Sequence, residues 1–278
     1  MSDKKLLENI KKLRELTGVG FKDCKLAIDE NNGDIEKSIE FLRKKGIAKA
    51  SKKMSRTASE GLVLVHEENG NISILEINSE TDFVAKNEDF ISFCKEVAEI
   101  NFIQKGDLEK TNNSDMKNKS KVKDNLIDLI AKIGEKITLR RSAFFSKDNG
   151  SNYHYVHGSI VKNVGKIISI VKLDKDSSDT GTKLAMHIAA SNPLSIDQTS
   201  LKKELLDKEL EIIKAELLNS GKKPDMIDKI SKGKLNKFIS DNTLINQAWI
   251  MDPQQKVSDV LKDTKVLEFI RYKVGEGV

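Results

Sequence analysis

The chain is organised around one polar stretch, Asn78-Ser79-Glu80-Thr81-Asp82-Phe83-Val84-Ala85-Lys86-Asn87, which separates two apolar segments. The segment before it, Ile72 to Ile77, follows an Asn69-Gly70 turn and has the composition of a strand. The segment after it, Phe90 to Val97, places apolar residues at helical spacing. Phe83 therefore lies at a strand-to-helix corner, where the ring either packs under its own sheet or points outward as an anchor for another protein. For a corner phenylalanine, packing into the core is the commoner outcome.

Length, composition and charge limit the class of protein that this chain can be. The 278 residues are enough for two or more small domains, and 38% hydrophobic with 33% charged residues suit packed cores under a well-solvated surface. The sequence contains no run near the roughly 18 apolar residues of a membrane-spanning helix, and its first residues resemble neither a signal nor a transit peptide. A cytoplasmic protein without membrane contact is expected. The net charge of +5 permits a nearby nucleic acid without requiring one.

The motifs of common catalytic and metal sites are missing from the sequence. Cys24 and Cys94 fall on separate predicted helices and form no metal or redox motif. There is no phosphate-binding Gly-x-x-x-x-Gly-Lys loop, no His-Glu-x-x-His and no Gly-x-Ser-x-Gly, and the four histidines have no acids at catalytic or metal-ligand spacing. We therefore expect no catalytic residue, no metal and no cofactor, which favours a binding protein over an enzyme.

Three short helices are predicted in the first domain, residues 1–47. The third, Ile35 to Lys45, starts after a capping Asp34 and is expected to end at Gly46. Residues 48–59 have no apolar periodicity and are predicted to be a linker.

Two further domains are predicted from a repeated order of strand, turn, strand, polar corner and helix. The order occurs first from Gly61, in subdomain 60–145, where residues 104–121 read as a polar surface insertion of little sequence constraint. It recurs in subdomain 146–278, with a strand at Gly158 to Val161, a second strand from Ile167 and a helix at Leu184 to Ala190. A heptad seam from Leu206 to Leu217 predicts a helical hairpin at about 200–240. The expected fold class is α+β, with a three-helix bundle, two related subdomains of antiparallel strands and helices, and a coiled-coil hairpin insertion.

Several stretches resemble the translation elongation factor Ts family, in that family's order along the chain. The most specific are Thr17 to Gly46, Thr81 to Lys86, Ala131 to Lys136, Met186 to Ser191, Phe269 to Arg271 and Val274 to Gly277.

This resemblance implies a bundle of the ubiquitin-associated type and a guanine-nucleotide exchange factor. Such a protein binds elongation factor Tu, both GDP-bound and nucleotide-free, and promotes GDP release without touching the nucleotide. The resemblance implies that the magnesium-dislodging loop is Thr81, Asp82, Phe83 and Val84, with Phe83 as the wedge. It further implies partner contacts by Arg14, Phe21 and Lys22 on the bundle and by His187 in the second subdomain.

Two other functions compete with this one. A basic RNA-associated adaptor would use Lys49 to Arg56 together with the helical hairpin, and its RNA binding would weaken steeply with salt. Ubiquitin-type recognition by the first module would leave the rest of the chain unexplained. Co-purification separates these functions. The exchange factor is favoured if a GTPase of translation binds the protein and dissociates when GDP and magnesium are added.

Overall fold

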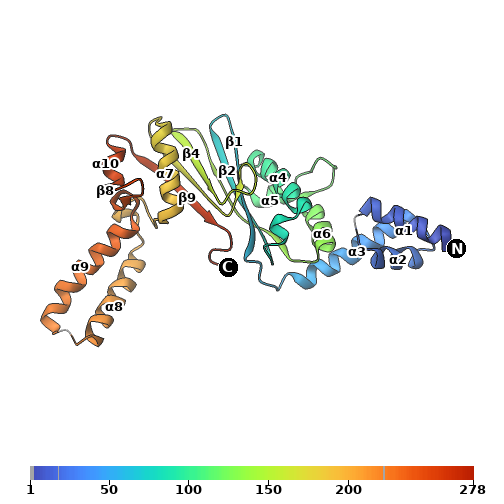
Figure 1. The fold of residues 1–278 in the computed structure, drawn as a ribbon, viewed down its shortest axis with the longest axis horizontal. Helices are drawn as coiled ribbons and strands as arrows, with labels where there is room; N and C mark the ends of the chain where they lie inside the picture. Colours follow the sequence, from blue (N-terminus) through green and yellow to red (C-terminus); the bar gives the residue numbers. More distant parts are fainter. Residues whose placement is uncertain (1–2, 18, 222) are drawn as a thin grey trace.

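A computed structural model describes residues 3–17, 19–221 and 223–278. The molecule is elongated, with a helical bundle at one end, a layered α+β core in the middle and a two-helix arm at the other end (Figure 1). The expected α+β class is confirmed. Within the described residues no helix is long and apolar enough to cross a bilayer.

The N-terminal bundle packs three helices around a small apolar cluster that includes Ile10, Leu13, Cys24 and Ile28. The helices are α1 (Asp3–Thr17), α2 (Phe21–Glu30) and α3 (Ile35–Lys53).

The third helix does not end at Gly46 as predicted. It continues to Lys53, so the first residues of the expected linker are helical. A Cβ added at Gly46 would lie 3.2 Å from the Cβ of Ala131 in α6 (Val122–Ile133). The glycine thus allows α3 and α6 to approach closely, and that packing outweighs the weak helix propensity of the residue.

The core consists of four layers: helices, sheet, sheet and helices (Figure 1). Strand β1 (Glu60–Glu68) shows how the layers form. Leu62 and Leu64 face the first helical layer, whereas Val63 and Val65 alternate onto the other face and pack against Ile168 and its neighbours in the second sheet. Both faces of this antiparallel sheet are therefore covered, which explains its nearly continuous apolar run.

The described part of the chain forms three sheets. The first has the order β3 (Ile137–Phe145), β2 (Asn71–Ser79), β1 (Glu60–Glu68), β5 (Val164–Gly165); the second β4 (Ser151–His157), β6 (Ile167–Leu173), β9 (Val266–Lys273); and the small third pairs β7 (Ala248–Trp249) with β8 (Asp252–Lys256). The first sheet is covered by α4 (Glu88–Ile103), α5 (Leu108–Asn113) and α6, and the second by α7 (Ser178–Ser191) and α10 (Val257–Leu261).

The second subdomain differs from the predicted order of elements. No strand forms at Gly158 to Val161; β6 pairs instead with β4, which the sequence did not mark. Gly158 has φ +63°, and it turns the chain just after β4 ends. Helix α7 also begins earlier than predicted, at Ser178.

The polar segment 104–121, expected to be a surface insertion of little sequence constraint, has a defined structure. It contains α5, whose Thr111 is buried and accepts a hydrogen bond from the Nδ2 of Asn101 at 3.1 Å. Met116 also joins the core of the first sheet. A few inward residues are enough to anchor an otherwise polar segment.

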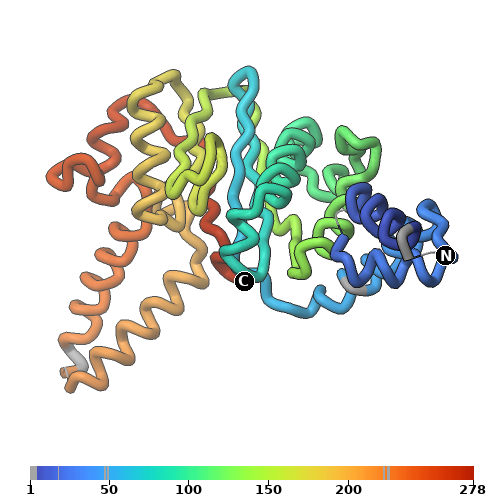
Figure 2. The backbone as a smooth tube through the Cα atoms, turned by 45° about the vertical axis from the view of Figure 1, so that its right-hand side comes forward, coloured from blue at the N-terminus to red at the C-terminus, as the bar shows by residue number. Residues whose placement is uncertain are grey.

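The predicted helical hairpin is present as α8 (Lys203–Asn219) and α9 (Pro224–Asn242). Its buried contacts are centred on Ile213, Leu217 and Ile227. Figure 2 shows this arm standing away from the rest of the chain.

A buried acid joins the two sheets to the C-terminal residues. Glu76 is fully buried, and its carboxylate accepts hydrogen bonds from Arg140 at 3.0 Å, Arg141 at 2.5 Å, Asn78 at 3.0 Å and the backbone N–H of Gly275 at 2.8 Å. A register shift between β2 and β3 lets two consecutive arginines reach the same carboxylate. Burial raises the pKa of Glu76, but these donors outweigh it and hold the pKa below its ordinary value.

Candidate partner-binding site

The corner loop between β2 and α4 presents its aromatic ring to solvent. Phe83 is 78% exposed, while the next two residues, Val84 and Ala85, are buried in the core of the first sheet. Phe83 has helical dihedral angles (φ −63°, ψ −41°) and precedes the short 3-10 helix Val84–Lys86. Because Val84 and Ala85 fill the inward positions of this turn, the ring of Phe83 is left on the outside.

Hydrogen bonds on both sides fix the shape of the loop. The carboxylate of Glu135 accepts from the backbone N–H of Thr81 at 2.9 Å and from its hydroxyl at 2.7 Å. The carboxylate of Glu80 accepts from the backbone N–H of Lys136 at 2.6 Å. On the other side, Asn87 caps α4 by accepting from the N–H of Phe90 at 3.1 Å. A loop held in this way loses little conformational entropy when a partner binds it.

A charged pair flanks the exposed ring. Asp82 and Lys86 form a salt bridge of 2.9 Å, and the ammonium of Lys86 lies 5.9 Å from the centre of the Phe83 ring. The hydrogen bond from Lys86 lowers the pKa of Asp82, so this carboxylate is ionised at neutral pH. The tip of the loop therefore offers a partner one large apolar surface next to a carboxylate and an ammonium group.

The three bundle residues implied by the resemblance are also at the surface. Arg14 on α1 and Lys22 on α2 are exposed, and Phe21 is 47% exposed at the first position of α2. Gly20 before it is extended (φ −62°, ψ 151°) and caps the helix without a side chain. The bundle thus combines an accessible aromatic ring with two cations.

His187 is placed differently from the expectation that it presses directly on a partner. It is fully buried in α7, stacked on Trp249 with ring centroids 5.2 Å apart. Its Nδ1 accepts from the N–H of Ile250 at 3.3 Å, so Nε2 carries the proton and donates to the Oε1 of Gln247 at 2.9 Å. Burial lowers the pKa of His187. The ring is therefore neutral and joins α7 to the segment that follows the arm.

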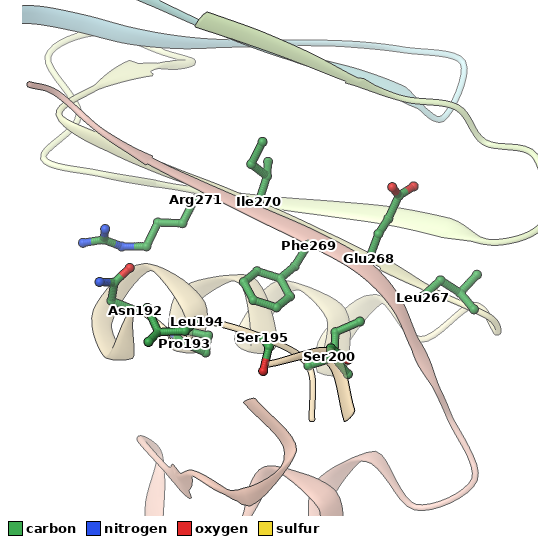
Figure 3. A pocket seen from close by; sticks show the side chains of 11 residues that line it. Asn192, Pro193, Leu194, Ser195, Ser200, Leu267, Glu268, Phe269, Ile270 and Arg271 are labelled. Carbon is green, nitrogen blue, oxygen red and sulfur yellow. The ribbon is translucent and has the colours of Figure 1, made fainter. Parts of the chain in front are cut away.

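A groove of about 500 Å³ lies between β9 and residues 192–200 (Figure 3). Phe269 points from β9 into this groove toward Ser195, whereas Ile270 points to the opposite face of the strand. The only ionisable groups in its lining are Glu268 and Arg271, and the guanidinium of Arg271 bonds Ala189 and Glu276. The groove thus has no arrangement of groups for acid–base chemistry. Among the described residues no three His, Cys, Asp or Glu side chains converge as metal ligands would.

The sequence did not identify the residues that clamp the loop. In the sequence, Glu135 and Lys136 stand out only as part of a stretch that resembles the family, and Glu80 only as part of the polar stretch itself. Glu135 lies 54 residues from Thr81 along the chain, so no local pattern could have paired them. The available signal was an acid directly after the helix-ending Gly134.

Comparison with known proteins gives one family. The model of the family Elongation factor TS matches residues 80–276, from the corner loop to the C-terminal segment that binds Glu76. The chain is 39% identical to Elongation factor Ts of Methylobacterium nodulans, over 97% of this chain and 92% of that protein. It is 38% identical to that of Rickettsia felis, over 97% and 91%, and 40% identical to that of Xanthobacter autotrophicus, over 97% and 92%. The chain therefore belongs to the elongation factor Ts family, the nucleotide exchange factors of elongation factor Tu, which are not enzymes.

Proposed function

We propose that this protein accelerates GDP release from elongation factor Tu by inserting Phe83 into the partner's nucleotide-binding domain. The ring separates helices of that domain, which displaces the magnesium ion and loosens the phosphate site so that GTP can bind. The observation that carries the proposal is a large apolar ring, 78% exposed, on a loop clamped at both ends. An exposed aromatic side chain on a rigid loop is typical of a binding hot spot.

Thermodynamic reciprocity accounts for the exchange. If the protein binds nucleotide-free partner more tightly than GDP-bound partner, it must weaken GDP binding by the same factor. Burying a phenylalanine side chain contributes roughly 1.5 to 3 kcal/mol, and each 1.4 kcal/mol corresponds to about tenfold in affinity. Burial of Phe83 alone therefore accounts for about one to two orders of magnitude of the weakening of GDP binding. Displacement of magnesium and the remaining contacts supply the rest.

The bundle acts as a second point of attachment in this proposal. Arg14, Phe21 and Lys22 hold the nucleotide domain from another side and so raise the effective concentration of the loop at its target. Because His187 has no exposed surface, its contribution is indirect, through the packing of α7 against Trp249. We place this activity in the cytoplasm.

The RNA-adaptor alternative is weakened by the contacts of its basic segment. The ammonium of Lys53 donates to the carbonyl of Gly134, and Arg56 pairs with Glu80 at 3.3 Å. Two cations of the segment are thus used within the fold rather than offered to phosphates.

The test is the release of a fluorescent GDP analogue from purified elongation factor Tu, followed by stopped flow with and without this protein. We expect release to accelerate with increasing protein, and the complex to dissociate when GDP and magnesium are added together. Unchanged release would contradict the proposal. Salt-sensitive retention of RNA in place of a GTPase would instead favour the adaptor.

A further inference from the structure

The corner between α6 and β3, residues Gly134, Glu135 and Lys136, forms hydrogen bonds in two directions. Toward the loop, Glu135 accepts from the N–H and the hydroxyl of Thr81 at 2.9 and 2.7 Å, and the N–H of Lys136 donates to Glu80 at 2.6 Å. The loop residues thus held lie directly before Asp82 and Phe83. Two consecutive residues, Glu135 and Lys136, therefore fix the entrance of the loop.

Toward the bundle, the same corner binds the end of α3. The ammonium of Lys136 donates to the carbonyls of Met54 and Arg56, both at 2.8 Å, and the ammonium of Lys53 donates to the carbonyl of Gly134. Gly134 has φ +90°, the left-handed conformation that turns the chain sharply out of α6. Because of this turn, residues that are adjacent in the chain form hydrogen bonds to the loop on one side and to the end of α3 on the other.

Helix α3 is the element that joins the bundle to the core (Figure 1). It packs along α6, where Arg43 forms a salt bridge of 3.0 Å with Asp124. The corner thus sits between the helix that carries the bundle and the loop that carries Phe83. Both elements are needed at once if the protein binds its partner at two points.

We propose that Glu135 is a positioning residue for nucleotide exchange, which presents Phe83 through its two hydrogen bonds to Thr81 while the corner fixes the loop relative to α3. The inference rests on the proposed wedge function of Phe83 and extends it. Without the clamp, the residues before Phe83 must be ordered at the moment of insertion, and each ordered residue costs conformational entropy. The cost falls on insertion of the ring rather than on the first docking through the bundle.

Three variants separate positioning from charge and from general stability. Glu135→Ala removes both acceptors. Glu135→Gln keeps the geometry, because its carbonyl oxygen can accept from the Thr81 N–H while its amide donates to the Thr81 hydroxyl. Glu96→Ala is the matched control, since Glu96 is also half-buried and accepts a loop N–H, that of Lys117, but outside the Phe83 loop and the corner that clamps it.

The measurement is stimulated release of fluorescent GDP at increasing concentrations of elongation factor Tu, together with urea unfolding of each variant. For Glu135→Ala we expect the maximal rate to fall on the order of tenfold, with a half-saturating concentration unchanged within about twofold. Glu135→Gln should recover most of the rate, and Glu96→Ala should match the wild type.

The decisive comparison adds Glu135→Ala to Phe83→Ala. If Glu135 acts by presenting the ring, the double variant is no slower than Phe83→Ala alone. A tenfold further loss in that background, or a wild-type rate for the single Glu135→Ala variant, would overturn the inference while leaving the wedge intact. If wild-type protein fails to accelerate release at all, the proposed function itself fails, whatever Glu135 does.

Discussion

Replacement of Phe83 by alanine should separate exchange activity from folding. The ring is 78% exposed in the free protein, so truncating it removes little buried area, and we expect the free energy of unfolding to change by less than about 0.5 kcal/mol. In the proposed complex the partner buries the same ring. At roughly 25 cal/mol per Å², loss of a phenylalanine side chain corresponds to about 1.5 to 3 kcal/mol. We therefore expect stimulated GDP release to slow by about ten- to a hundredfold.

The assay is stopped-flow release of fluorescent GDP from elongation factor Tu, with urea unfolding measured on the same preparations. Ile103→Ala is the matched control, because Ile103 is 71% exposed but lies at the opposite end of α4 from the loop. It should leave the stimulated rate unchanged. A Phe83→Ala rate equal to that of the wild type, or an equal loss with Ile103→Ala, would refute the reasoning. A large loss of stability in Phe83→Ala would show that the ring belongs to the core after all.

Three further predictions concern stability. Glu76→Ala leaves two half-buried arginines without their carboxylate and should lower the free energy of unfolding by about 1 to 3 kcal/mol in urea. Because the native pKa of Glu76 lies below its ordinary 4.5, its contribution is present above pH 4.5 and is lost as the pH falls through the native pKa; Glu76→Gln should flatten that acid slope. Gly275→Ala places a Cβ 2.0 Å from the carbonyl oxygen of Ser59 and should lower the free energy of unfolding by about 1 to 3 kcal/mol in the same assay. Gly277→Ala is the control: its Cβ would lie 3.6 Å from the nearest atom, on a side chain, so the free energy of unfolding should fall less. His187 has a native pKa below 6.5, so the unfolded chain binds the extra proton and stability should rise with pH up to about 6.5. Because burial also lowers the pKa of His154, His187→Ala should reduce this rise in thermal melts without abolishing it, and it should lower the melting temperature.

Local patterns predicted most of the elements but failed where a distant segment decides the outcome. Gly46 stops a helix in isolation, yet Ala131 of α6 packs against it and α3 continues. The sequence does not mark strand β4, because Ser151 to His157 contains a single branched aliphatic residue, Val156, and its pairing with β6 gives it its structure.

The candidate site, like the fold, could be predicted from the sequence only in part. Which residues form the loop could be taken from the sequence, but the direction of the Phe83 ring depends on Val84 and Ala85 filling the core beneath it. The clamp on Thr81 and the burial of His187 depend on residues 54 and 60 positions away, Glu135 and Gln247. Separations of that length leave no periodic trace in a single sequence.

The bond between Glu76 and Gly275 also bears on how the chain is made. The two residues are 199 positions apart, and β9, which completes the second sheet, lies just before Gly275. On the ribosome the bundle and the first three strands emerge long before these last residues. During that interval Glu76 lacks one of its donors and β6 has no partner on one side, so the nascent chain carries an open sheet edge. The second sheet and the set of donors around Glu76 are therefore completed only once β9 and Gly275 have been made.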